Sequence, residues 1–221
     1  AAYPETLQPP PQLSADSLLN LSCNAHKISK VFLCGQNRTK PLGAMLRLLE
    51  LGQYEPLVAT ENGETVGYAM VWLSKDRKGV LLDYLGVLRG KRNGGTGGKI
   101  LALLLERYGH IFGEAEAPTS DDEEENQLRR RRIGFYQRNG FRVLDYGCAL
   151  FGVHFKCLYG GPETDDRVVE KLHRRVYADY FSPAHMQQYI QLPLSPGEDI
   201  HPAPAWTEEH NPTEYERKVI S

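Results

Sequence analysis

The sequence predicts an α/β (α+β) fold in which helices flank a mixed, mostly antiparallel sheet. Short apolar runs joined by tight polar turns are typical of antiparallel strands. They alternate with segments whose apolar residues recur every three or four positions, as in amphipathic helices. The 221 residues, of which 41% are hydrophobic, are enough for one domain of about 150 residues with extensions.

The N-terminal part of the chain contains one clear helix. Thr39–Leu51 carries apolar residues on one face and is followed by Gly52, a typical helix stop. Before it, residues 3–12 are rich in proline and predict an extended arm. Ser14 is expected to cap a short helix that ends near Asn24.

Three strands and two turns follow and predict an antiparallel meander. Tyr54–Glu61 and Thr65–Leu73 are apolar runs separated by Asn62-Gly63, a strong signal for a two-residue hairpin. The polar turn Lys75–Gly79 then leads to a third strand that begins at Val80. We expect this third strand to lead into the next helix.

The rest of the chain alternates between helices and strands. The predicted elements are a helix over Gly97–Tyr108, a strand over Ile111–Ala117, a strand over Phe141–Tyr146, an amphipathic helix over Asp165–Phe181 and a short helix over Ala184–Gln191. Residues 192–221 are rich in proline and charge, and predict a docked arm or a disordered tail.

These elements divide the chain into three parts. Residues 1–36 are expected to form an N-terminal arm and short helix, and residues 37–161 the central domain. Residues 162–221 form a C-terminal helical extension with a proline-rich tail. The apolar face of this extension must pack on something, so it either walls a site or forms a seam between two copies.

Composition and charge exclude several classes of protein. A formal net charge of −2 gives no bulk attraction to nucleic acid. Every apolar run is shorter than the roughly 18 residues of a membrane span and no signal-peptide pattern is present, so a cytoplasmic protein without a membrane partner is expected. The four cysteines, Cys23, Cys34, Cys148 and Cys157, lack metal-ligand spacing and predict reduced thiols and no metal site.

The most informative segment is a glycine-dense turn between a predicted strand and a predicted helix. Its glycines are Gly94, Gly95, Gly97 and Gly98. Glycine lets the backbone approach a ligand closely, and the N-terminus of a helix adds partial positive charge. Its basic neighbours are Arg89, Lys91 and Arg92. The turn therefore predicts a phosphate-binding site, with a flexible structural turn as the plain alternative.

Two common phosphate-binding loops do not fit this spacing. A P-loop needs a glycine where Asn93 stands and a hydroxyl residue where Ile100 stands. A dinucleotide-binding loop also needs a glycine at Ile100, and an acidic strand end about 20 residues later that is missing here. Both classes are excluded.

Two motifs together indicate a family. Arg92–Gly97 fits Arg/Gln-x-x-Gly-x-Gly/Ala and resembles the acyl-CoA pyrophosphate loop of the GNAT N-acetyltransferases. Phe135–Phe141 contains Phe-Tyr-x-x-x-Gly-Phe and resembles the second motif of that family, in the same order along the chain. The resemblance covers about Leu42–Tyr159 and implies a GNAT-like fold for residues 37–161, with acetyl-CoA as cofactor.

The resemblance also implies a set of site residues. In the family, the strand that enters the glycine turn is splayed from its neighbour, so that backbone N–H groups at its end reach the thioester carbonyl and the pantetheine. The implied cofactor-binding residues are Leu85, Gly86, Val87, Arg92, Asn93, Gly94, Gly95, Thr96, Gly97 and Gly98. Gly86 suits a kink in the strand. Tyr136 takes the family's role of protonating the departing thiolate, with aromatic packing as its alternative.

The helix before the second motif departs from the family pattern. The positions seven and four before the tyrosine, commonly an asparagine and a small residue, are Arg129 and Arg132 here. This weakens a cofactor contact at these turns and suggests an anionic group nearby. The acidic run Asp121–Glu125 before them is best explained as a solvated helix face.

An amine acceptor needs a group that takes its proton, and a partly desolvated carboxylate is the usual choice. Glu116 is the preferred base, with Glu114 on the same side of its predicted strand, and Asp83 is the second candidate. A solvent-facing strand edge explains Glu114 and Glu116 equally well, and pairing with an arginine explains Asp83. His110 and His154 fit structural or surface roles.

The resemblance therefore implies an N-acetyltransferase that moves an acetyl group from acetyl-CoA to a primary amine by direct attack in a ternary complex. No cysteine lies in either motif, so no cysteine intermediate is expected. The partner is a small-molecule or peptide amine, and a homodimer remains open. The alternatives are a non-catalytic acetyl-CoA sensor or assembly module, and a protein or peptide N-acetyltransferase.

Overall fold

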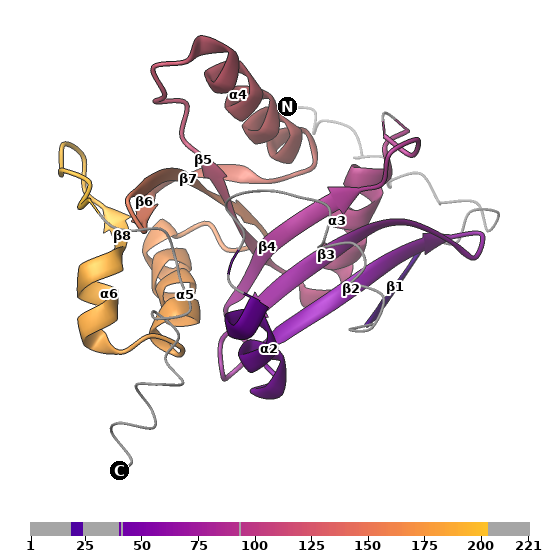
Figure 1. The fold of residues 1–221 in the computed structure, drawn as a ribbon, viewed down its shortest axis with the longest axis horizontal. Helices are drawn as coiled ribbons and strands as arrows, with labels where there is room; N and C mark the ends of the chain where they lie inside the picture. The colour runs from indigo at the N-terminus through magenta and orange to yellow at the C-terminus, as the bar shows by residue number, and fades with distance from the viewer. Residues whose placement is uncertain (1–18, 24–39, 41, 93, 203–221) are drawn as a thin grey trace, which may run out of the picture.

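The described part of the chain folds around one sheet of eight strands. The computed structural model describes residues 19–23, 40, 42–92 and 94–202. Neighbouring strands follow the order β1-β2-β3-β4-β5-β7-β6-β8 (Figure 1). The strands are β1 Leu19–Cys23, β2 Tyr54–Glu61, β3 Glu64–Leu73, β4 Val80–Val87, β5 Ile111–Glu116, β6 Arg142–Leu150, β7 Val153–Gly160 and β8 Ile190–Leu194. Only the β4–β5 pair is parallel among these strands, so the predicted mixed, mostly antiparallel sheet is confirmed.

Helices cover both faces of this sheet. They are α2 Leu42–Glu50, α3 Thr96–Tyr108, α4 Glu123–Arg138, α5 Asp166–Ala178 and α6 Pro183–Tyr189. Apolar side chains of α3 and α4 share one buried cluster with the sheet, whereas α2, α5 and α6 share a second cluster on the opposite face. Burial of these two apolar faces is the main force that holds the helices on the sheet.

The meander β2-β3-β4 follows the bounds expected from the sequence. The Asn62-Gly63 turn has positive φ angles of 53° and 80°, as a tight hairpin of the I′ type requires. Tyr54 then pairs with Trp72 across the first hairpin, and Val80 pairs with Leu73 across the second. The alternating side chains of these strands fill both buried clusters.

Two short edge strands were not expected. Residues 19–23 form β1 beside β2, so the helix expected up to Asn24 is wrong over this stretch, while Ser14 lies outside the described residues. Leu19 and Leu21, two positions apart, both pack against the buried cluster. This two-residue period is that of a strand, so the packing stabilises a strand here rather than a helix. The short helix expected to end at Gln191 ends at Tyr189, and the chain continues as β8 beside β6.

The C-terminal extension packs onto the sheet. Val169, Val176 and Tyr177 of α5 are buried with Trp72 of β3 in one cluster. The rings of Trp72 and Tyr177 lie 5.1 Å apart in an edge-to-face arrangement. None of the described helices is long and apolar enough to cross a membrane.

Candidate active site

The parallel strands β4 and β5 separate within the sheet. Among the described residues they pair only at Leu81 with Phe112 and at Leu82 with Gly113. The register of β3 with β4 also shifts at this level, from Leu82 opposite Val71 to Tyr84 opposite Met70, so that Asp83 is an extra, bulged residue. We call the opening between β4 and β5 beyond Leu82 and Gly113 the fork.

Among the described strands, the far end of β4 pairs on one side only, with β3. Leu85 pairs with Ala69, Gly86 with Tyr68 and Val87 with Gly67. The bulge at Asp83, rather than a kink at Gly86, marks the point where β4 leaves β5. Gly86 has a different role, because a Cβ atom there would lie 2.2 Å from the Tyr68 ring.

The glycine turn connects β4 to the N-terminus of α3. Gly95 precedes the helix with φ 74°, a left-handed conformation that favours glycine. Among the described residues, a Cβ atom at Gly94 or Gly95 would meet nothing within 4 Å, so the backbone there is open with respect to this part of the chain. Thr96 begins the helix and its hydroxyl donates to the Lys91 carbonyl at 3.2 Å. Open backbone at a helix N-terminus fits a phosphate group.

Two further residues of the predicted cofactor site, Arg92 and Asn93, precede these glycines. Arg92 is exposed and its Nε donates to the Val87 carbonyl at 3.3 Å, which leaves the guanidinium at the surface beside the turn. Asn93 lies outside the described residues. The positive charge of Arg92 therefore stands where the turn meets solvent.

The two sequence motifs meet in space. A Cβ atom at Gly97 would lie 3.1 Å from the Phe135 ring, and one at Gly98 would lie 2.3 Å from the Asn139 side-chain oxygen. Asn139 ends α4 and donates from its amide to the Phe135 carbonyl at 2.7 Å. The start of α3 therefore packs directly on the end of α4, and this contact depends on two glycines.

Tyr136 lies beside the fork on the α3 and α4 face of the sheet. Its ring packs edge-to-face against Phe141 with centroids 5.4 Å apart, and a Cβ atom at Gly113 would lie 3.9 Å from it. Burial raises the pKa of Tyr136 to about 12, partly offset by the nearby charge of Arg132. The hydroxyl is therefore protonated near neutral pH and able to donate a proton.

Asp83 lies on the opposite face of the sheet from Tyr136. Its carboxylate accepts a hydrogen bond from the Tyr54 hydroxyl at 2.5 Å and forms an ion pair with Lys40 Nζ at 2.7 Å. The sequence allowed an arginine as its partner, and the structure shows a lysine instead. Burial raises the pKa of Tyr54 well above its ordinary value, with the Asp83 charge adding to the effect.

Glu114 is the first β5 residue within the fork and accepts hydrogen bonds from the C-terminal extension. His173 Nε2 lies 2.9 Å from its Oε1, and the Tyr177 hydroxyl lies 2.7 Å from both carboxylate oxygens. The thiol of Cys148 is 3.8 Å away. Burial alone would lower the pKa of His173, but its bonds to Cys157 and Glu114 outweigh burial and raise this pKa to about 9. Glu114 is thus not a solvent-facing residue.

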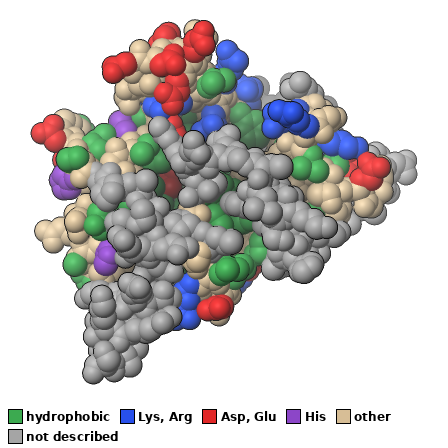
Figure 2. All heavy atoms as spheres, viewed as in Figure 1, with side chains coloured by type: hydrophobic (Ala, Val, Ile, Leu, Met, Phe, Trp, Pro, Cys, Tyr) green, Lys and Arg blue, Asp and Glu red, His purple; other side chains and the backbone are tan. Residues whose placement is uncertain are grey.

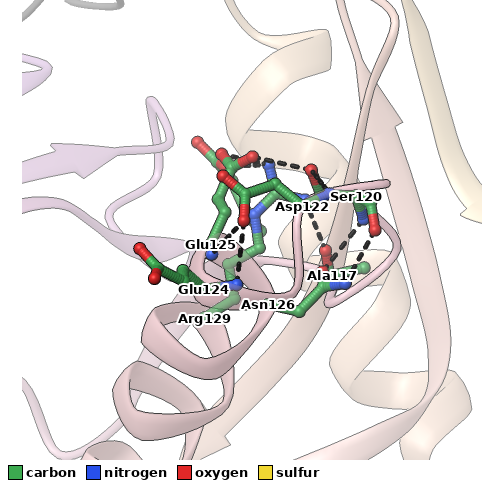
Figure 3. Close-up of polar contacts among 8 residues, drawn as sticks. Ala117, Ser120, Asp122, Glu124, Glu125, Asn126 and Arg129 are labelled. Carbon is green, nitrogen blue, oxygen red and sulfur yellow. Dashed lines mark hydrogen bonds and ion pairs between the residues drawn. The ribbon is translucent and has the colours of Figure 1, made fainter.

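Glu116 lies at the end of β5 and pairs with α4. Arg129 reaches Glu116 at 2.8 Å and Glu125 at 2.7 Å, and its guanidinium also donates to the Ala117 carbonyl at 2.8 Å. Figure 3 shows Arg129 and Glu125 together at the first turns of α4. The anionic groups that Arg129 suggested are therefore carboxylates of this chain.

The loop that leads into α4 is held by reciprocal bonds. The Ser120 N–H donates to the Asn126 side-chain oxygen at 2.9 Å, and the Asn126 amide donates back to the Ser120 carbonyl at 2.7 Å (Figure 3). Asp122 caps the helix by accepting the N–H groups of Glu124 and Glu125. The acidic side chains at this end of α4 are exposed, as the red spheres at the top of Figure 2 show, and support a solvated face.

A comparison with known protein families matches the central part of the chain, where these candidate site residues lie. Residues 52–143 match the family model of the acetyltransferase (GNAT) domain. They include the fork, the glycine turn and α4. Residues 52–143 are therefore similar to a GNAT acetyltransferase domain.

Solved structures with this GNAT fold superpose on most of the chain. A Bacteroides thetaiotaomicron protein described as a GNAT-family acetyltransferase gives a TM-score of 0.57 at 16% identity, over 77% of this chain and 98% of that one. A Bacillus subtilis acetyltransferase in complex with CoA gives 0.49 at 12% identity, over 66% and 100%. A Vibrio cholerae spermidine N-acetyltransferase in complex with CoA and spermine gives 0.49 at 9% identity, over 64% and 94%. The first of these likenesses supports the fold alone, and no curated protein gives a significant match.

The GNAT domain does not supply every residue around the fork. Lys40, His173 and Tyr177 lie outside the matched segment and were not among the predicted site residues. His173 is fully buried four positions after Val169 and four before Tyr177. That four-residue spacing was the one sequence signal that His173 lies on the buried face of its helix. Its partner Glu114 could not be identified in this way, because it lies 59 residues away in the chain.

Proposed function

We propose that this chain is an acetyl-CoA-dependent N-acetyltransferase that acetylates a primary amine by direct attack in a ternary complex. The observation that carries the proposal is the fork. It places carboxylates on one face of the sheet, at Asp83 and Glu114, and a protonated hydroxyl on the other, at Tyr136. Proton removal and proton donation are then available at the same level of the sheet.

The residues around the glycine turn fit the phosphates of the acyl donor. Open backbone at Gly94 and Gly95, the N-terminus of α3 and the exposed Arg92 provide N–H donors and positive charge. Acetyl-CoA supplies the activated thioester when it is bound. Beyond Leu82, where the described pairing of β4 with β5 ends, the backbone of Leu85, Gly86 and Val87 provides groups for a thioester carbonyl, and Tyr136 provides the proton for the thiolate.

The amine approaches from the face that carries Asp83 in this proposal. Asp83, Tyr54 and Trp72 form an acidic and aromatic wall that suits an ammonium group. Glu116 remains a candidate base, and either carboxylate must leave an ion pair before it accepts a proton, Glu116 that with Arg129 and Asp83 that with Lys40. We assign proton removal first to Asp83 because it lies at the point where β4 leaves β5.

Calorimetric titration of the whole chain with acetyl-CoA tests this function, with desulfo-CoA and ATP as controls. We expect the chain to bind both CoA compounds and not ATP. When a primary amine is added to the complex with acetyl-CoA, free CoA thiol should be released. Failure to bind either CoA compound would withdraw the proposal and leave the glycine turn with a structural role.

A further inference from the structure

A lysine of the chain itself occupies the carboxylate side of the fork. Lys40 Nζ lies 2.7 Å from Asp83 Oδ2 and 3.9 Å from the centroid of the Trp72 ring. The side chain is 5% exposed. The backbone N–H of Lys40 donates to the Tyr84 hydroxyl at 2.8 Å, so both the main chain and the ammonium group dock on consecutive residues of β4. The ammonium group is thereby fixed next to the point where β4 leaves β5.

The surroundings of this ammonium are those that a primary alkylammonium ligand needs. Asp83 supplies a charge-assisted hydrogen bond, and the faces of Trp72 and Tyr54 lie within cation–π distance at 3.9 and 5.4 Å. The charge of Glu114, the first β5 residue within the fork, also acts on Lys40. Lys40 thus presents to the fork the same group that an external amine acceptor would present.

Burial also prepares this amine for reaction. An ammonium group must lose a proton before its nitrogen attacks a carbonyl. Burial lowers the pKa of Lys40 from its ordinary value, although the Asp83 carboxylate partly opposes the effect. A larger fraction of Lys40 is therefore neutral than of a lysine in solvent, and Asp83 is in contact to accept the proton.

We propose that Lys40 is an internal acceptor, acetylated in cis by acetyl-CoA bound in the fork. The inference rests on the proposed function. Asp83 takes one proton from the ammonium, and Nζ then attacks the thioester carbonyl carbon. The C–N bond forms and the C–S bond breaks. The second proton lost by the nitrogen balances the one gained by the departing thiolate, so the products are N-acetyl-lysine, free CoA thiol and the proton held by Asp83.

The test is incubation of the full chain with acetyl-CoA, followed by peptide mapping by mass spectrometry. Lys78, an exposed lysine of the same chain, reports spontaneous acetylation. Lys40 is expected to gain one acetyl group roughly tenfold faster than Lys78 or more, because a held nucleophile has a high effective concentration. The rate should not depend on protein concentration, and Gly95→Val should reduce it to the rate of Lys78.

Each outcome decides the proposal. If acetyl-CoA binds by calorimetry and Lys40 stays unmodified, or reacts no faster than Lys78, the internal-acceptor role is overturned and the proposed enzyme remains. A rate that rises with protein concentration, or that Gly95→Val leaves unchanged, overturns it as well. If acetyl-CoA does not bind at all, the proposed function and this inference fall together.

Discussion

Gly98 and Asn139 join the two ends of the candidate cofactor site. A Cβ atom on Gly98 would stand 2.3 Å from the Asn139 side-chain oxygen, closer than real side chains come. The Asn139 amide is meanwhile committed to the Phe135 carbonyl at 2.7 Å. Neither residue can change size without moving the contact between the start of α3 and the end of α4.

Gly98→Ala is expected to destabilise the fold by about 1 kcal/mol. The added methyl group should cost about 1–3 kcal/mol in strain, partly offset by the gain of up to about 1 kcal/mol that alanine brings inside a helix. Urea denaturation measures the change. Gly134→Ala, inside α4, is the control for helix propensity, because among the described residues its Cβ would meet only the flexible end of Arg138.

The double variant Gly98→Ala/Asn139→Ala isolates the contact. Asn139→Ala alone loses a hydrogen bond worth about 1 kcal/mol. The double variant should be more stable than the sum of the single effects predicts, because the clash disappears with the asparagine. Additive effects would show that the two residues do not press on each other.

Gly95→Val is expected to abolish CoA binding while the chain stays folded. A β-branched residue at φ 74° is strained by about 1–2 kcal/mol, and its side chain would enter the open space that fits a phosphate. Gly52→Val is a matched control, since Gly52 has φ 68°, equally open surroundings and a position at the end of α2. Unchanged CoA affinity by calorimetry in Gly95→Val would remove the glycine turn from the cofactor site.

The elements of the fold were predictable where local signals are strong. The Asn62-Gly63 turn defined the hairpin between β2 and β3, and the apolar stripe of α3 predicted a helix within one residue of the observed start at Thr96. Edge strands β1 and β8 were missed because each has five residues. In such short segments, pairing with a neighbouring strand decides the structure more than local propensity does.

The candidate site was less predictable because its contacts are long-range. The glycine turn could be predicted from consecutive residues, but Glu114 and His173 meet across 59 positions and Lys40 meets Asp83 across 43. Their partners follow from how α5 packs on the sheet and from the bulge at Asp83, which no local pattern encodes.

Tyr136→Phe should lower turnover by about 10² or more with near-normal acetyl-CoA affinity, since only proton donation is lost. The raised pKa of about 12 keeps the hydroxyl protonated across the neutral range. Tyr108→Phe removes a hydroxyl bonded to Glu55 near the far end of α3 and serves as the comparison. Steady-state kinetics with an accepted amine measure both variants. Wild-type turnover in Tyr136→Phe would exclude the residue from the mechanism.

Asp83→Asn and Glu116→Gln separate the two candidate bases. A base must be deprotonated to act, so its titration sets the acid limb of the profile of kcat/KM against pH. We expect Asp83→Asn to lower kcat/KM by about 10²–10⁴ and to remove that limb, while Glu116→Gln leaves it in place. If the limb moves in Glu116→Gln instead, the role belongs to Glu116, and if neither variant moves it, water carries the proton.

His173 should make the stability of the fold depend on pH. Its pKa is about 9 in the folded chain, against an ordinary value of 6.5, because bonds to Cys157 and Glu114 outweigh burial. A group whose pKa rises on folding contributes its full stabilisation below pH 6.5 and loses it as the pH approaches 9, which is worth at most roughly 3 kcal/mol.

The Cys157 thiol has the opposite effect and must be separated from that of His173. Its bonds to Cys148 and His173 outweigh burial and lower its pKa to about 7, so its contribution is lost as the pH falls. Cys157→Ala also removes one of the two contacts that raise the His173 pKa, so the decline in the free energy of unfolding above pH 6.5 that urea titrations measure in this variant comes from Glu114 and should be smaller. Glu114→Gln in the same background should flatten this dependence, because it removes the carboxylate 2.9 Å from the imidazole. An equally steep decline in both variants would show that Glu114 does not hold the proton on His173.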